Sequence, residues 1–260
     1  MPITRCPPPS RRDPAKSRIT PSASSHPPLA LNGRRLLEAA RHLGSRDGDL
    51  QSILKTHGPP PLWGRRPGFQ TLIRIILEQQ VSLASADATF RRLSARVTPL
   101  TAERLLVVGE ARLRSFGVTR QKAAYCVHLA EAICGGRLDL DAVARMDDAT
   151  AAGTLTRLKG VGPWTAEIYL LMALRRPDVW PAGDLALVQT VRRVKRLRKP
   201  PSPARMMKIA EGWRPYRSVA ARMLWQHYLA GSAGDGFMQI LDRRFVPLDG
   251  RYYGDRQHQS

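Results

Sequence analysis

Cysteines and long apolar runs are both scarce in this chain of 260 residues. Its three cysteines, Cys6, Cys126 and Cys134, form neither a disulfide framework nor a metal-binding spacing. A reducing, intracellular environment fits that usage. No apolar run approaches the ~20 residues that span a bilayer, so we expect no membrane segment. The first residues also lack the apolar core of a secretory signal.

Acidic residues are few as well. The chain has 42 Lys and Arg against 21 Asp and Glu, which gives a formal charge of +21. A surplus of this size binds polyanions through counterion release, and therefore predicts a nucleic-acid partner. A basic but merely solvated surface is the alternative. Residues 1–28 contribute five cations and one acid, so +17 remains on the rest of the chain.

Helical periodicity dominates from about residue 31, with apolar residues at spacings of three and four. No β-hairpin signal or series of alternating strands occurs. The sequence therefore predicts an all-α fold of roughly ten short helices. They are expected near residues 31–43, 47–57, 68–80, 82–97, 101–107, 109–115, 119–134, 147–157, 163–175, 184–196, 203–212 and 216–230.

The two ends of the chain differ from this helical region in composition. Residues 1–28 are rich in Pro, Ser and Arg and predict a disordered basic arm. A transit peptide and a misassigned start codon are the alternatives. Residues 29–232 form the predicted folded domain. Residues 233–260 have no clear periodicity and predict an irregular tail.

The stretch LKGVG, residues 158–162, joins two predicted helices. Gly160 and Gly162 permit positive φ angles, and Pro163 suits the first turn of the next helix. The free N–H groups and the positive dipole end of that helix favour an anion, and Lys159 adds charge. A phosphate of a nucleic-acid backbone fits this hairpin, although a plain corner between helices would have the same pattern.

A single acid, Asp184, ends the Pro/Gly-rich stretch PAGD that follows the hairpin helix. Asp184 is also well placed to cap the helix beginning at Leu185. The helix dipole would keep a capping carboxylate ionised, so the two roles are compatible.

Four segments in order make the chain resemble the helix-hairpin-helix, Gly/Pro...Asp (HhH-GPD) superfamily of DNA glycosylases. They are LIRIILEQQVSLASA (72–86), LKGVGPWTA (158–166), PAGD (181–184) and WRPYRSVAARMLW (213–225). The last is similar to a segment of the AlkA-like 3-methyladenine DNA glycosylase II branch. The resemblance implies two helical subdomains with a cleft between them. It covers about residues 60–230.

Departures from the family pattern refine this expectation. No cysteine follows Cys134, so the iron–sulfur loop of the endonuclease III branch is not expected. Trp164 stands where bifunctional members carry a catalytic lysine, so no Schiff base and no strand cleavage are expected. The segment before the match is too short and too polar for the N-terminal β-rich domain of the full AlkA-like architecture.

The resemblance assigns roles to individual residues. Asp184 is the expected catalytic carboxylate, stabilising the positive sugar as the base leaves. Gln80 aligns with the residue that wedges into the gap left by the flipped base. The base pocket is expected to contain Trp164, Ile168, Tyr169 and Trp225. The expected contacts with the DNA backbone come from Lys159, Gly160, Val161, Gly162 and Thr165.

Each of these positions has an ordinary structural alternative. Tryptophans in helices are more often core residues, and Gln80 could be a surface or capping group. Arg217 could bind phosphate or pair with a core acid. Glu167 is expected to be solvated.

The sequence thus predicts a monofunctional hydrolase that flips and releases alkylated bases of the 3-methyladenine and 7-methylguanine type. Alternatives are a same-fold glycosylase for deaminated or oxidised purines and a non-catalytic lesion-binding protein. We expect a monomer that binds double-stranded DNA with damaged bases and needs no catalytic metal. A monovalent cation at the hairpin is implied by the family. The expected location is the cytoplasm, at the nucleoid, in a bacterium, or the nucleus or an organelle in a eukaryote.

Overall fold

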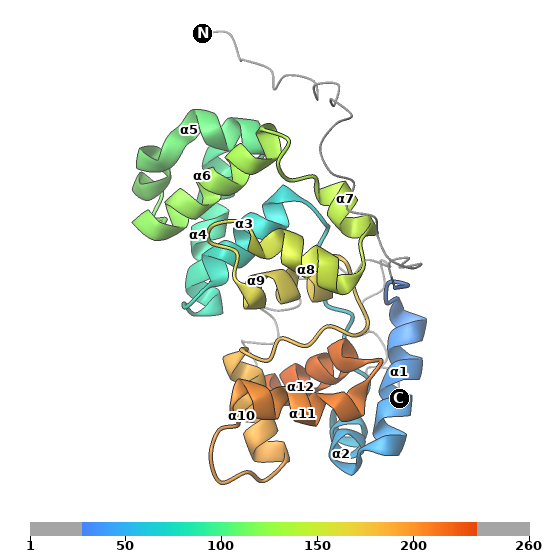
Figure 1. Ribbon diagram of the computed structural model, residues 1–260. Helices are drawn as coiled ribbons and strands as arrows, with labels where there is room; N and C mark the ends of the chain where they lie inside the picture. The colour runs from blue at the N-terminus through green and yellow to red at the C-terminus, as the bar shows by residue number, and fades with distance from the viewer. Residues whose placement is uncertain (1–27, 233–260) are drawn as a thin grey trace, which may run out of the picture. The chain divides into compact units, whose positions relative to one another are not determined.

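The computed structural model describes residues 28–232. The predicted tail and all but the last residue of the predicted arm lie outside the described residues. Every regular element between residues 28 and 232 is a helix, which confirms the all-α fold (Figure 1). Within the same range, no helix combines the length and apolarity that a membrane crossing requires.

The described chain divides into two compact units. The first contains residues 68–166, and the second contains residues 28–67 and 167–232. The two units agree with the predicted pair of helical subdomains, and each is described by itself below.

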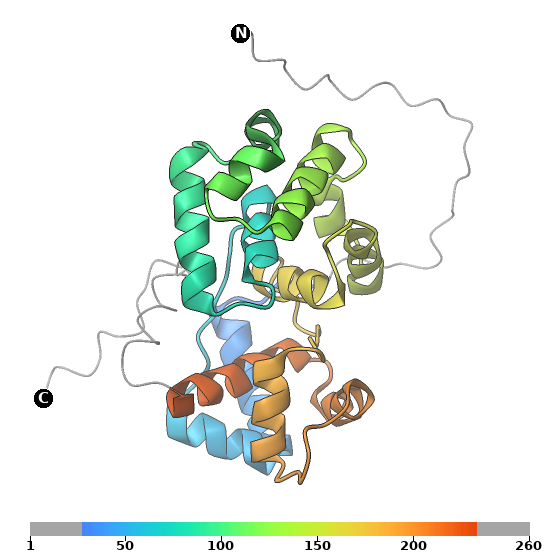
Figure 2. The same cartoon turned by 90° about the vertical axis from the view of Figure 1, so that its left-hand side faces the viewer.

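The first unit contains six helices and the start of a seventh. They are α3 (Phe69–Glu78), α4 (Leu83–Arg96), α5 (Ala102–Ser115), α6 (Arg120–Cys134), α7 (Leu140–Arg145), α8 (Asp148–Thr156) and α9 (Pro163–Ile168). Helix α3 packs against α4 and α6, and α5 lies beside α6 in both views (Figures 1 and 2). Seven residues of α3 are buried, which confirms it as the predicted core helix.

Two local features refine the helix predictions in this unit. The predicted pair of short helices near residues 101–115 is one element, α5, broken at Gly109, whose φ of 72° interrupts the helical backbone. Asp147 caps α8 by accepting a hydrogen bond from the Thr150 N–H, as expected for one of the two neighbouring aspartates. Helix α7 was not predicted, because six residues are too few to show a helical period.

The second unit is built around α12 (Arg217–Ser232), which packs against α1 (Gly33–Arg46), α2 (Gly48–His57) and α10 (Leu185–Val194) (Figure 2). Helix α11 (Pro203–Ala210) leads into a short 3₁₀ turn at Glu211–Trp213. The predicted helix over residues 163–175 continues past α9 as a π-helix, Tyr169–Ala173. All five residues of that π-helix are buried.

A polar network around Asp47 joins three elements of the second unit. The Asp47 carboxylate caps α2 and accepts hydrogen bonds from Lys195 Nζ at 2.7 Å and from Trp213 Nε1 at 2.8 Å. Lys195 also bonds Asp49 at 2.8 Å. Burial raises the pKa of Asp47, but the bonds from Lys195 and Trp213 outweigh it, so the pKa lies below its usual value. The network therefore ties the start of α2 to the end of α10.

Candidate active site

Asp184 is the N-cap of α10, as its position before Leu185 predicted. Its Oδ1 accepts a hydrogen bond from the Leu187 N–H at 3.0 Å. The same oxygen accepts a second bond from Trp225 Nε1 at 3.1 Å. Two donors from separate helices therefore fix the orientation of this half-buried carboxylate.

Trp225 lies on α12 with 8% of its surface exposed. The structure thus brings together two residues that lie 41 positions apart and were predicted to share a site. The Trp225 indole ring packs within the second unit, and its N–H orients the Asp184 carboxylate.

The loop that leads to Asp184 is anchored by the first turn of α12. Ser218 Oγ donates to the Val179 carbonyl and accepts from the Val179 N–H, both at 2.9 Å. The Ser218 N–H bonds the Pro177 carbonyl at 3.0 Å. Since Ser218 is fully buried, these bonds form in a low-dielectric environment and hold the loop rigidly.

Arg217 pairs with an acid rather than remaining free for phosphate. Its Nε lies 2.9 Å from Asp178 Oδ1, and its Nη2 donates to the Asp178 carbonyl at 2.7 Å. This resolves the two alternatives left open by the sequence. Asp178 belongs to the same loop, so the Arg-Ser pair that opens α12 fastens the chain six residues before Asp184.

The hairpin of residues 158–162 turns at Gly160, whose φ is 91°. A Cβ at Gly160 would lie 2.2 Å from Tyr125 Cγ on α6, so only glycine fits. Val161 is 3% exposed and packs into the first unit. The turn is thus held against α6 by its own shape.

Gln79 supports the hairpin from the other side. Its side-chain Nε2 donates to the Gly160 carbonyl and to Thr165 Oγ1, both at 2.9 Å. The end of α3 is thereby linked to both sides of the hairpin. The carbonyl oxygens of Gly160 and Leu158 each accept a hydrogen bond, and a monovalent cation at this hairpin stays a prediction.

The five predicted backbone-binding residues differ in exposure. Lys159 and Gly162 are exposed, and Gly160 is half-buried. The side chains of Val161 and Thr165 are buried, at 3% and 2% exposure. Any contact of these two residues with DNA would therefore use their main-chain groups, while the exposed Lys159 can offer its ammonium.

Gln80 follows Gln79 in the turn between α3 and α4. It is exposed and adopts a φ of 54°, which is uncommon for a residue with a side chain. A constrained, exposed residue of this kind suits the predicted wedge, and that role remains a prediction.

The residues predicted for the base pocket belong to two different units. Trp164 is half-buried in the first unit. Ile168 and Tyr169 belong to the second unit and are 5% and 0% exposed, so their side chains are part of its packed interior. Any contribution of Ile168 and Tyr169 to a base pocket would therefore come from beneath its exposed surface.

Glu167 does not have the solvated environment expected from the sequence. It is half-buried on α9, and burial raises its pKa to about 7 against the opposing effect of the Arg217 charge. The prediction was wrong because a polar residue on a short helix gives no sign of which face is covered.

The family model described as "HhH-GPD superfamily base excision DNA repair protein" matches residues 73–215. The chain belongs to this superfamily. Its HhH-GPD relatives include DNA-3-methyladenine glycosylase 1 of Schizosaccharomyces pombe, 30% identical over 198 residues that cover 74% of this chain and 87% of the relative.

One further relative and one solved structure extend the similarity. DNA-3-methyladenine glycosylase 2 of Escherichia coli is 29% identical over 180 residues, covering 62% of this chain and 59% of that protein. A solved structure of the S. pombe 3-methyladenine DNA glycosylase in complex with abasic DNA has a TM-score of 0.65 and 28% identity. It covers 73% of this chain and 95% of the solved one.

Three supporting residues were not predicted: Gln79, Asp178 and Ser218. Gln79 is next to Gln80, Ser218 is next to Arg217, and Asp178 lies on the loop before Asp184. A doubled glutamine after an apolar helix and the Arg-Ser pair were the available signals. Their partners lie far along the chain, so the sequence alone could not identify them.

Proposed function

We propose that this HhH-GPD protein is a monofunctional DNA glycosylase that releases alkylated bases and leaves an abasic site. The observation that carries the proposal is the Asp184 carboxylate, oriented by both the α10 N-terminus and Trp225 Nε1. The names of the relatives described above support the alkylated-base substrate. The protein would act as a monomer on duplex DNA.

The chemistry follows from the residues present. A base within a duplex is out of reach, so the nucleotide is flipped out, with Gln80 filling the gap. Departure of the base leaves positive charge on the deoxyribose. The Asp184 carboxylate stabilises that charge and orients or deprotonates the attacking water. Because its two donors are already in place, the carboxylate needs no reorganisation during the reaction.

The pocket residues fit electron-poor purines. Alkylated purines such as 3-methyladenine and 7-methylguanine are already good leaving groups, and the faces of Trp164 and Trp225 would attract them by stacking and cation–π contact. Trp164 stands in place of the amine that a lyase needs, so the DNA strand stays intact after base release.

Base release from methylated duplex DNA tests the proposal. Free 3-methyladenine or 7-methylguanine should be found by chromatography, and the strand should break only after alkali treatment. Release of deaminated or oxidised purines instead would favour the same-fold alternative. Release of no base, with DNA still bound, would favour a non-catalytic binding protein.

Asp184→Asn isolates the carboxylate charge in the same assay. Asparagine caps a helix as well as aspartate does, so α10 should keep its stability. We expect base release to slow about 100-fold or more while DNA binding stays largely unchanged. An unchanged rate would remove Asp184 from the mechanism.

A further inference from the structure

The last turn of α10 and the loop after it carry a dense run of cations. Residues 191–200, VRRVKRLRKP, contain six Lys or Arg and no acid. The segment lies entirely within the second unit, so its surroundings can be described directly.

Within residues 28–232, only one of the six cations has a carboxylate partner. Lys195 bonds Asp47 and Asp49, as described above. The other five are exposed, and none forms an ion pair with a residue in the range 28–232. We call these five residues the α10 basic surface: Arg192, Arg193, Arg196, Arg198 and Lys199.

Helix stability explains two of these five charges. Arg192 and Arg193 lie in the last turn of α10, where the helix dipole stabilises a cation. Arg196, Arg198 and Lys199 lie beyond the helix and have no such benefit. Unpaired like charges this close repel one another, so the cluster destabilises the fold slightly unless an anion binds to it.

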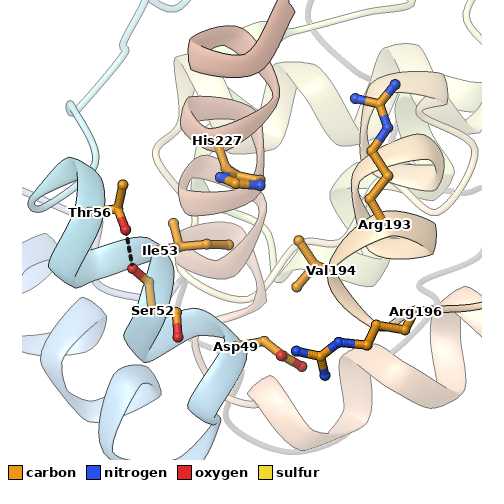
Figure 3. A pocket seen from close by; sticks show the side chains of 8 residues that line it. All are labelled: Asp49, Ser52, Ile53, Thr56, Arg193, Val194, Arg196 and His227. Carbon is orange, nitrogen blue, oxygen red and sulfur yellow. Dashed lines mark hydrogen bonds between the residues drawn. The ribbon is translucent and has the colours of Figure 1, made fainter.

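A pocket of about 240 Å³ opens beside this surface, between α2, α10 and α12 (Figure 3). Its polar lining consists of Asp49, Ser52, Thr56, Arg193, Arg196 and His227. Figure 3 shows the Arg196 side chain extending toward Asp49 at one side of the pocket. Asp49 is the one acid in this lining, and its charge is matched by Lys195 at 2.8 Å. The pocket therefore offers a recess beside two guanidinium groups.

The α10 basic surface is remote from Asp184 along the helix. Asp184 caps the start of α10, whereas Arg192 and Arg193 lie in its last turn. Ten residues at 1.5 Å each place these two ends about 15 Å apart. The surface is therefore a separate feature from the carboxylate site.

We propose that the α10 basic surface is a second nucleic-acid site, which binds the phosphate backbone of duplex DNA without reading its sequence. Guanidinium groups match phosphate oxygens in pairs, and exposed cations release counterions when they bind DNA. No Phe, Tyr or Trp occurs in residues 191–200 or in the pocket lining. The surface thus lacks the stacking platform typical of single-strand binders. The choice of duplex DNA over other polyanions rests on the proposed function.

The test is the salt dependence of binding to an undamaged duplex of about three helical turns. The full chain is compared with the triple variant Arg193→Gln, Arg196→Gln, Arg198→Gln by fluorescence anisotropy. Each lost phosphate contact lowers the slope of log affinity against log salt by ~0.9, so the slope should fall by roughly two to three. Affinity at low salt should fall about tenfold or more.

A matched control removes the same charge elsewhere. Arg41, Arg137 and Arg145 are exposed, lie outside the α10 basic surface and form no ion pair with a described residue. Their triple change to Gln should lower the slope by less than about one. Equal effects of the two triple variants would show that only total charge matters and would overturn the proposal.

A third variant guards against a folding defect. Changing the same three α10 arginines to Lys keeps the charge, so the salt slope should stay near that of the wild type. A loss as large as that of the Gln variant would indicate disturbed packing and overturn the proposal. So would a larger effect on a single-stranded oligonucleotide than on the duplex. Because anisotropy measures binding and not base release, these results do not depend on whether excision occurs.

Discussion

Trp225 Nε1 donates a hydrogen bond to Asp184 Oδ1 at 3.1 Å, linking α12 to the carboxylate at the start of α10. Trp225→Phe removes this donor and keeps an aromatic face. A hydrogen bond to a charged group contributes about 1.5–3 kcal/mol, so the single-turnover rate of base release should fall roughly 10- to 100-fold. The rate is measured on methylated duplex DNA with protein in excess.

Trp213→Phe is the matched control for that change. It removes an indole donor to a different carboxylate of the same unit, Asp47. Base release well below the unfolding temperature should stay within about twofold of the wild type, since Asp184 is untouched. If Trp225→Phe also left the rate unchanged, the indole N–H would have no part in orienting Asp184.

Gln79 should stabilise the hairpin, although the sequence alone did not identify it. Gln79→Leu removes two hydrogen bonds and leaves the Gly160 carbonyl without that donor, which costs about 1–3 kcal/mol. The unfolding temperature should fall, and affinity for duplex DNA should drop about tenfold as the hairpin loosens. Thermal unfolding and anisotropy measure the two effects.

Gln80→Leu distinguishes the structural role of Gln79 from the predicted role of Gln80 as a wedge in the DNA. Gln80 is exposed and has no hydrogen-bond partner among residues 28–232, so its loss should leave stability within about 0.5 kcal/mol. If both changes altered stability equally, Gln79 would have no special role in holding the hairpin.

Helix positions were largely predictable because the signals are local. Apolar spacing located α3 and α6, and capping residues such as Asp147 located helix starts. The break in α5 could be foreseen because Gly109 separates two apolar patterns. The π-helix at Tyr169–Ala173 could not, since its backbone depends on burial against the rest of the second unit.

The candidate site was predictable where the family motif names the residue, and not where partners meet across the chain. Asp184 stands in the motif, and its capping role follows from the next residues. The pairing of Arg217 with Asp178 joins positions 39 apart, so the sequence left two alternatives. Glu167 shows the same limit, because its burial is decided by neighbours that the sequence does not place.

Asp47→Asn tests the network that holds the second unit. Asparagine keeps the cap of α2 but removes the charge that pairs with Lys195, so stability near pH 7 should fall by about 1–3 kcal/mol. The pKa of Asp47 is lower in the folded protein than in the unfolded chain, so its stabilisation is present above its usual pKa of 3.8. It is lost as the pH falls through the folded pKa.

Denaturant unfolding at two pH values checks the Asp47 prediction. The gap between wild type and variant should be largest near neutral pH and should close well below pH ~4, where the carboxyl is protonated in both states. A gap independent of pH would mean that the charge of Asp47 does not contribute.

Glu167→Gln should raise stability, whereas Asp47→Asn should lower it. Burial raises the pKa of Glu167 to about 7, whereas the unfolded group ionises near 4.5. Between these values the folded state keeps a proton that the unfolded state has lost, so the contribution of Glu167 to stability falls as the pH rises. Above pH ~7 the variant should be more stable by at most about 3 kcal/mol, less because water partly screens the group.

The pH profile of thermal unfolding distinguishes an effect of the Glu167 charge from a gain in stability that is the same at every pH. Wild type and Glu167→Gln should unfold at the same temperature below pH ~4, where both side chains are neutral, and diverge as the pH rises through 4.5 to about 7. Glu103→Gln is the control, because Glu103 is exposed in the first turn of α5 and should change stability by no more than about 0.5 kcal/mol. Equal unfolding temperatures for wild type and Glu167→Gln at pH ~8 would mean that the Glu167 carboxylate is as well solvated in the folded protein as in the unfolded chain.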